Sequence, residues 1–195
     1  FIKNFTVEND FTYGIGPGLG IDYETEEKLM HFLKNYNEPL VLDADALNLL
    51  SKNPENLNLI PKKSIITPHP KEFSRLFGES KDSFERLELA KSKAKELNIY
   101  IVLKGHHTQI ITPEGNVFYN ITGNSGLAKG GSGDVLLGII TSFLAQGYSP
   151  ENAAIFGVWL HGKAADFTAE KYSKEAMLAS DVIQHIGEVF KFLQK

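Results

Sequence analysis

The stretch of residues 40–78, LVLDADALNLLSKNPENLNLIPKKSIITPHPKEFSRLFG, contains the same unit twice, a short apolar run followed by a helix signal. In the first unit, the apolar residues 40–42 precede the helical stretch 46–50. In the second, a strand signal at 64–67 leads into residues 70–78, which begin with proline and close with glycine as helices prefer. Strands that alternate with helices predict a largely parallel sheet.

The same alternation continues on both sides of this stretch. The elements expected outside it are helices at 25–36, 84–97, 134–146, 151–171 and 180–192, a strand at 99–103, and a hairpin of strands at 108–112 and 116–121. The pattern predicts an α/β fold with a mainly parallel sheet and helices on both of its faces. With 195 residues and no linker or internal repeat, we expect one domain over residues 1–195.

Composition excludes several classes of protein. Lys and Arg number 20 against 24 Asp and Glu, and no basic block stands out, so binding to nucleic acid is not expected. The longest uncharged run, residues 135–150, is shorter than the roughly 20 apolar residues of a membrane span and predicts a buried helix instead. The chain has no cysteine, which removes disulfides and zinc–thiolate sites and fits a reducing, cytoplasmic location.

Glycine gathers in one segment of the chain. Five of the 17 glycines fall within the eleven residues from Gly123 to Gly133, directly before an uncharged helix. Free amides and the positive dipole end at a helix start bind anions, so we predict an anion hole at Gly131, Ser132 and Gly133, with charge added by Lys129. The alternative is a flexible surface loop in which Ser132 only caps the helix.

Asp134 follows this segment, in the first turn of the expected helix. An acidic residue at this position often does no more than complement the helix dipole. Beside a phosphate site, however, a carboxylate can take the proton from an attacking hydroxyl. We therefore favour Asp134 as a general base.

A second glycine cluster, GIGPGLG at residues 14–20, does not fit a dinucleotide-binding loop. The third glycine of that motif is missing, and Pro17 removes a backbone donor. Four carboxylates follow at Asp22, Glu24, Glu26 and Glu27 and would repel a pyrophosphate. The cluster predicts a wall against a neutral or flat part of a ligand, or else a turn that only joins a strand to a helix.

Three further groups lie where strands are expected to end. Asp43 and Asp45 follow the strand at 40–42, at the edge where open α/β sheets bind ligands. His69 is held between two prolines after the next strand, and we expect it to contact a ligand. Lys104–Thr108 could bind a nucleotide through backbone groups and the Lys and Thr side chains, or could simply form a hairpin turn.

The histidines do not predict a metal site. His106 and His107 are adjacent but have no carboxylate partner at metal-ligand spacing. Apart from His69, the remaining histidines are each solitary on an expected helix and are interpreted as ordinary surface or core residues; they are His31, His161 and His185. No metal held by protein side chains is expected.

Taken in order, five motifs closely resemble the ADP/ATP-dependent NAD(P)H-hydrate dehydratases, a branch of the ribokinase-like superfamily. The motifs are GIGPGLG (14–20), LVLDADALNLL (40–50), ITPHPKEF (66–73), LKGHHT (103–108) and GNSGLAKGGSGDVLLGII (123–140). The resemblance implies a ribokinase-like three-layer sandwich. It also implies a hydro-lyase that repairs NADH or NADPH damaged by hydration of the nicotinamide ring.

The resemblance further implies a role for each candidate residue. Asp134 would deprotonate the hydroxyl of the S-form of the hydrate, which attacks the terminal phosphate of ADP or ATP, after which phosphate leaves. The implied contacts to the hydrate are Gly18, His69 and Asp134, and the implied nucleotide-binding residues are Lys104, Gly105, His106, His107, Thr108 and Gly133. Mg²⁺ would be held mainly by the phosphates.

Family members are commonly homotetramers, and some carry or accompany an NAD(P)H-hydrate epimerase. They usually have several tens of residues ahead of the first motif, which complete the sheet and add a substrate contact. This sequence begins at Phe1, so we expect a fragment that lacks its N-terminal portion and leaves one sheet edge open. The rival functions are a ribokinase-like kinase for a sugar or vitamin precursor, which would release a stable phosphoester, and a non-catalytic nucleotide-binding module.

Overall fold

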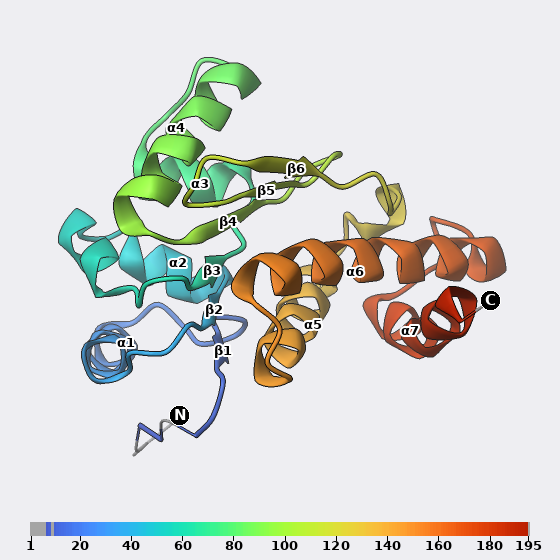
Figure 1. Ribbon diagram of the computed structural model, residues 1–195, viewed down its shortest axis with the longest axis horizontal. Helices are drawn as coiled ribbons and strands as arrows, with labels where there is room; N and C mark the ends of the chain where they lie inside the picture. The colour runs from blue at the N-terminus through green and yellow to red at the C-terminus, as the bar shows by residue number, and fades with distance from the viewer. Residues whose placement is uncertain (1–6, 9, 195) are drawn as a thin grey trace.

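The computed structural model describes residues 7–8 and 10–194 (Figure 1). Phe1, on which the expectation of a fragment depends, lies outside the described residues. One six-stranded sheet runs in chain order through β1 (Gly14–Ile15), β2 (Val41–Leu42), β3 (Ile65–Ile66), β4 (Tyr100–Leu103), β5 (Gln109–Ile111) and β6 (Val117–Tyr119). Strands β1 to β4 pair in parallel, and β5 and β6 continue the sheet as an antiparallel hairpin. The predicted sheet is confirmed.

The helices follow the sequence pattern closely. They are α1 (Tyr23–Asn35), α2 (Ala44–Leu50), α3 (Pro70–Phe77), α4 (Ser83–Leu97), α5 (Ser132–Ala145), α6 (Pro150–Tyr172) and α7 (Ala179–Leu193), with 3₁₀ turns η1 (Pro54–Leu59) and η2 (Ser125–Leu127). The caps explain the boundaries: Asp22 accepts from the Thr25 amide at 3.0 Å at the start of α1, and Asn98 ends α4 in the left-handed conformation. Strand β1 and both 3₁₀ turns were not predicted.

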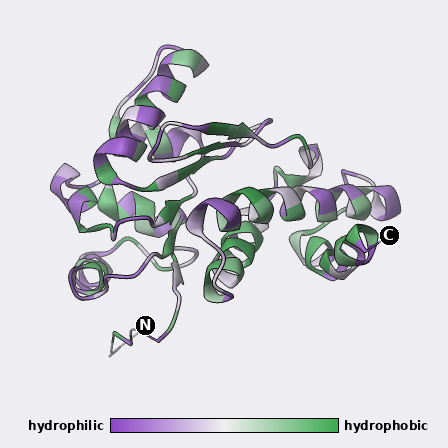
Figure 2. Cartoon of the chain, viewed as in Figure 1, coloured by the Kyte–Doolittle hydropathy of each residue, from purple (hydrophilic) through white to green (hydrophobic). Residues whose placement is uncertain are grey.

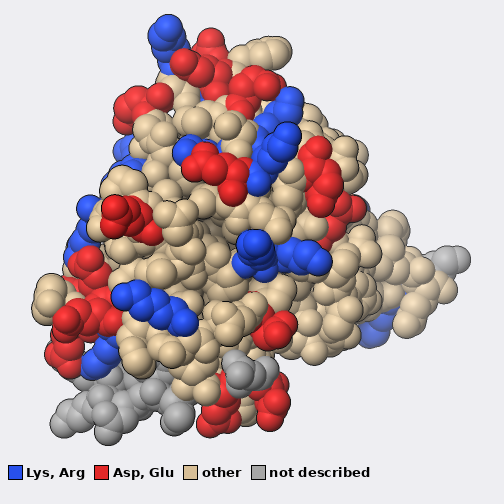
Figure 3. Space-filling model, turned by 60° about the vertical axis from the view of Figure 1, so that its left-hand side comes forward, with Lys and Arg blue, Asp and Glu red and all other residues tan. Residues whose placement is uncertain are grey.

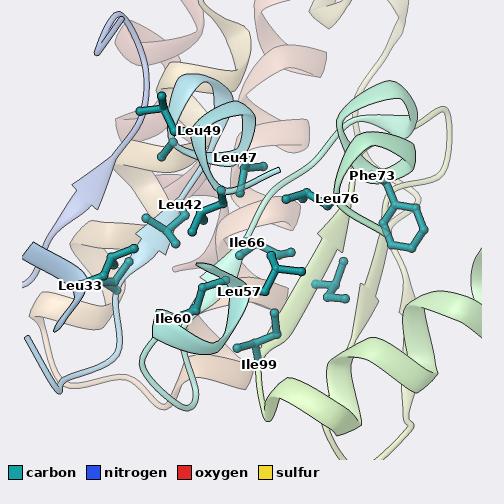
Figure 4. Packing of buried hydrophobic residues seen from close by; sticks show 14 of the residues in the cluster. Leu33, Leu42, Leu47, Leu49, Leu57, Ile60, Ile66, Phe73, Leu76 and Ile99 are labelled. Atoms are coloured by element: carbon teal, nitrogen blue, oxygen red, sulfur yellow. The ribbon is translucent and has the colours of Figure 1, made fainter. Parts of the chain in front are cut away.

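The sheet divides the core in two, because successive strand residues point to opposite faces. Leu42, Ile66 and Ile101 pack with α1 to α4 (Figure 4), whereas Val41, Ile65 and Val102 pack with α5, α6 and α7. Figure 2 shows the hydrophobic residues of the central strands and of α5 that supply these two layers. The predicted three-layer sandwich with helices on both faces of the sheet is confirmed.

Within the described part of the chain, no helix is both long and apolar enough to cross a membrane. On the face shown in Figure 3, Lys and Arg side chains are interspersed with Asp and Glu.

The candidate site lies at the edge of the sheet where the parallel strands end. Because β1 to β4 run in the same direction, their carboxyl ends meet at that edge. The residues that directly follow them are Gly16, Asp43, Thr67 and Lys104. Four of the five sequence motifs therefore reach the same edge, through the ends of β1, β2, β3 and β4.

Candidate active site

A partly buried ion pair lies at this edge, between the ends of β2 and β4. The ammonium Nζ of Lys104 donates to Oδ1 of Asp43 at 2.7 Å and to Oδ2 at 2.9 Å. Asp43 is only 1% exposed, and burial raises the pKa of its carboxyl, while the charge of Lys104 opposes that rise. The lysine is thereby fixed by a partner 61 positions earlier in the chain.

A second carboxylate, on α3, approaches the same lysine. Oε2 of the buried Glu72 lies 3.9 Å from Lys104 Nζ and accepts a hydrogen bond from the His69 amide at 2.8 Å. Lys104 also donates its amide to the carbonyl of Pro68 at 2.9 Å. The ends of β3 and β4 are therefore joined through both main chain and side chain.

His69 has a structural role as the N-cap of α3. Its ring Nδ1 accepts hydrogen bonds from the amides of Lys71 at 3.1 Å and Glu72 at 3.3 Å, which completes a capping box. Because Nδ1 accepts, the neutral ring carries its proton on Nε2, which lies 3.4 Å from Oε1 of Glu72. The sequence predicted a ligand contact from the rigidity of His69, and the cap is a further cause of that rigidity. The side chain is still 45% exposed at the site.

The start of α5 touches the ion pair. A Cβ atom added at Gly133 would lie 3.2 Å from Asp43 Oδ2 and 3.5 Å from Lys104 Nζ. The N-cap is Gly131, at a φ of 87°, and no side chain caps the helix. Ser132 is buried inside the first turn, so the alternative in which Ser132 caps the helix is wrong. The structure thus brings the predicted anion hole and Lys104 together.

The glycine-rich loop before α5 is anchored at both ends. Asp166 of α6 accepts from the Gly123 amide and from the Asn124 side chain, both at 3.0 Å. Lys129 Nζ donates to the carbonyl oxygens of Glu175 and Met177 at 2.6 and 2.7 Å. Its ammonium therefore ties the loop to the connection between α6 and α7, and its contribution of charge to the anion hole stays a prediction.

The remaining candidates are accessible. Asp134 is exposed directly after Gly133. Gly105, His106 and His107 are exposed in the turn between β4 and β5, where the two imidazole rings meet edge to face with centroids 4.4 Å apart. Thr108 Oγ1 lies 3.4 Å from the Gly105 amide in the same turn. The hairpin turn and the nucleotide-binding hypothesis are compatible in this geometry.

Gly18 lies in the loop that follows β1. It is exposed at a φ of 65°, and a Cβ there would meet nothing within 4 Å. The loop is tied to the start of α2 by a hydrogen bond of 2.9 Å from the Gly20 amide to Asp45 Oδ2. The wall predicted at residues 14–20 therefore borders the same edge of the sheet as Asp43.

His161 of α6 is a residue that the sequence interpretation left out of the site. Its side chain is buried, Nε2 has no hydrogen-bond partner among the described residues, and burial together with the charge of Lys104 lowers its pKa to about 4. Glu72 and Asp166 were also missed. No sequence signal separates His161 from an ordinary core histidine, because its proximity to Lys104 depends on how α6 crosses the sheet.

The low pKa of His161 predicts a pH-dependent stability. Unfolded His161 takes up a proton near its ordinary pKa of 6.5, whereas folded His161 stays neutral down to about 4, so stability is lost as the pH falls through this window. The difference corresponds to at most about 3 kcal/mol. In urea titrations between pH 7 and 4, the wild type should lose more stability than His161→Gln. Parallel pH profiles for the two proteins would contradict the assignment.

Among the described residues, no three His, Asp or Glu side chains are grouped so that they could hold a metal ion. The two buried carboxylates of the edge, Asp43 and Glu72, both face the ammonium of Lys104.

Comparison with known proteins identifies relatives of this architecture. The profile of a family described as NAD(P)H-hydrate dehydratase matches residues 12–188. A protein from Moorella thermoacetica named bifunctional NAD(P)H-hydrate repair enzyme is 40% identical over 183 residues, which are 93% of this chain and 34% of that protein. The chain thus spans about a third of the length of this relative.

Two solved structures are similar in fold. The ADP/ATP-dependent NAD(P)H-hydrate dehydratase from Bacillus subtilis, crystallised with ATP and Mg²⁺ and soaked with CoA, superposes with a TM-score of 0.79 at 36% identity, covering 92% of this chain and 66% of that one. A ribokinase-like superfamily protein from Enterococcus faecalis gives a TM-score of 0.77 at 34% identity, covering 91% of this chain and 61% of that one. The predicted ribokinase-like fold is confirmed.

Proposed function

Because the chain belongs to the NAD(P)H-hydrate dehydratase family, we propose that it catalyses the nucleoside-phosphate-dependent dehydration of the S-form of hydrated NADH or NADPH. ADP would be converted to AMP, or ATP to ADP, with release of phosphate. The names of the Moorella and Bacillus proteins support this reaction class. The activity proposed for this chain is that of the dehydratase part of such proteins.

One arrangement in the structure carries the proposal: the amide end of α5 lies against the Lys104 ammonium, with Asp134 exposed on the next residue. A helix N-terminus and a cation together favour a phosphate group. The carboxylate beside them is suited to accept a proton from a hydroxyl that attacks this phosphate. Together, the three groups are suited to activating a hydroxyl by transfer of a phosphoryl group to it.

In the proposed reaction, Asp134 takes the proton of the hydrate hydroxyl, whose oxygen forms a bond to the terminal phosphorus as the bridging oxygen of the nucleotide departs. The amides of Gly131 to Gly133 stabilise the charge that develops on the phosphoryl oxygens. The bond from the ring carbon to the phosphorylated oxygen then breaks, assisted by the ring nitrogen, and loss of a proton from the neighbouring carbon restores the nicotinamide double bond. Mg²⁺ held by the nucleotide phosphates would neutralise part of their charge.

The remaining contacts follow from the same placement. Gly18 and His69 would border the hydrate from the ends of β1 and β3, and Lys104 to Thr108 with Gly133 would hold the nucleotide. The exposure of Gly18, of His106 and of nearly half the His69 side chain supports these roles.

A ribokinase-like kinase is the second candidate, since it would use the same general base and anion hole. The two reactions differ in their products, because a kinase leaves a stable phosphoester and a dehydratase releases inorganic phosphate. Phosphorus NMR of a reaction with hydrated NADH, Mg²⁺ and ADP or ATP separates them. Inorganic phosphate formed in step with the nucleotide product supports the dehydratase, and an accumulating phosphoester supports the kinase.

We further propose a cytoplasmic homotetramer that works with an epimerase for the hydrate, either fused or separate. The bifunctional name of the Moorella relative, of which this chain spans 34%, supports a second activity on a longer polypeptide. Analytical ultracentrifugation of the chain tests the assembly. A clean monomer at micromolar concentration would contradict the tetramer.

A further inference from the structure

Asp43 contacts three of the sequence motifs at once. Its carboxylate binds Lys104. The same carboxylate lies so close to Gly133 that a Cβ atom added there would be 3.2 Å from Asp43 Oδ2. Its main chain is equally confined, because the Asp43 amide donates to the Ile15 carbonyl at 3.1 Å and the Asp43 carbonyl packs directly on Gly16. The side chain heads α2 but makes no capping hydrogen bond there. Both of its oxygens accept hydrogen bonds from Lys104.

We propose that Asp43 is a positioning residue that holds the Lys104 ammonium beside the amide end of α5, where the terminal phosphate of the nucleotide binds. The proposal rests on the proposed function for the identity of that phosphate. The ion pair itself is independent of the function.

The surroundings of Lys104 leave Asp43 as its main anchor. Glu72 lies farther away, at 3.9 Å, and already accepts the His69 amide. His161 is neutral at physiological pH and carries no negative charge to attract the lysine. A lysine side chain has a flexible four-carbon stem, so without a partner the ammonium would sample many positions. Asp43 removes that freedom before the nucleotide arrives.

Removing the charge of Asp43 should affect nucleotide affinity and turnover differently. A carboxylate next to a phosphate site repels the phosphate, so removing its charge should leave nucleotide affinity unchanged or increase it. Turnover, in contrast, depends on the ammonium being in place when charge develops on the phosphoryl group, and a misplaced group costs rate. The expected signature is a fall in kcat without a weaker nucleotide complex.

The test compares wild type with Asp43→Asn by two readouts. Acetylation of the folded proteins with acetic anhydride, followed by peptide mass spectrometry, measures how freely the Lys104 amine reacts; we expect several-fold faster labelling in the variant. Calorimetry should give an ADP Kd no higher than that of the wild type. A rate assay with hydrated NADH should give a kcat lower by about tenfold.

Val189→Ala is the matched control for lost stability, because Val189 is fully buried on α7 in the opposite helix layer. In this variant, the acetylation rate of Lys104 and the kcat should both equal those of the wild type. Asp43→Ser, which leaves room for a water beside Lys104, repeats the comparison if the asparagine variant does not fold.

Unchanged Lys104 labelling in the Asp43 variants, or a kcat no lower than that of Val189→Ala, would overturn the positioning role. An inactive wild type that does not bind ADP would instead overturn the proposed function, and the labelling result would still decide whether Asp43 holds the lysine.

Discussion

Asp134→Asn is expected to lower the rate of dehydration by at least ~10²-fold, the usual scale for the loss of a general base. Asparagine keeps the size of the side chain and much of its hydrogen bonding but cannot accept the proton of the attacking hydroxyl. ADP affinity should be unchanged or higher, since a negative charge is removed beside the phosphate. Steady-state kinetics and calorimetry with ADP measure the two quantities separately.

Glu151→Gln provides the control for this variant. Glu151 lies in the first turn of α6 as Asp134 lies in that of α5, so both substitutions remove a favourable interaction with a helix dipole, worth about 0.5 kcal/mol. Only Asp134→Asn should affect the rate. Turnover close to wild type in Asp134→Asn would exclude the general-base role and leave the dipole interpretation.

Gly16→Ala should cause the largest loss of stability, about 3 kcal/mol or more. A Cβ at Gly16 would overlap the carbonyl oxygen of Asp43, which is backbone and cannot move without breaking the pairing of β1 with β2. The φ of 143° is also unfavourable for any residue with a side chain. Urea unfolding of the variant and of wild type measures the difference.

Gly18→Ala tests whether the steric clash or the backbone angle causes the loss of stability expected for Gly16→Ala. Gly18 lies in the same loop at a φ of 65°, but a Cβ there meets nothing, so the expected loss is only about 1 kcal/mol. Equal losses in the two alanine variants would contradict the close approach of Gly16 to Asp43.

The sequence predicts the helices well because local signals determine where they begin and end. Proline opens α3 and Gly78 closes it, and the predicted boundaries of 70–78 differ from the observed helix by one residue. Strand β1 was missed because it has only two paired residues, Gly14 and Ile15, which lie inside a glycine-rich motif. Its place in the sheet depends on pairing with β2, which no local pattern contains.

The candidate site is less predictable because its contacts join distant positions. The ends of the strands identified Asp43 as a residue at the ligand-binding edge, but its pairing with Lys104 depends on how β2 and β4 flank β3. Lys129 was assigned to the anion hole from its neighbours in sequence, whereas its partners, Glu175 and Met177, come from the connection between α6 and α7. Charge and spacing suggested what these residues could bind, and the fold decided which partner was within reach.

The central claim, a nucleotide-driven repair of hydrated cofactor, is tested most directly by incubating the chain with hydrated NADH, Mg²⁺ and either ADP or ATP while recording absorbance at 340 nm. We predict that the absorbance of NADH returns with at least one of the two nucleotides, in proportion to the AMP or ADP formed, and does not return without nucleotide. No recovery with either nucleotide, by a folded protein that binds ADP, would contradict the claim.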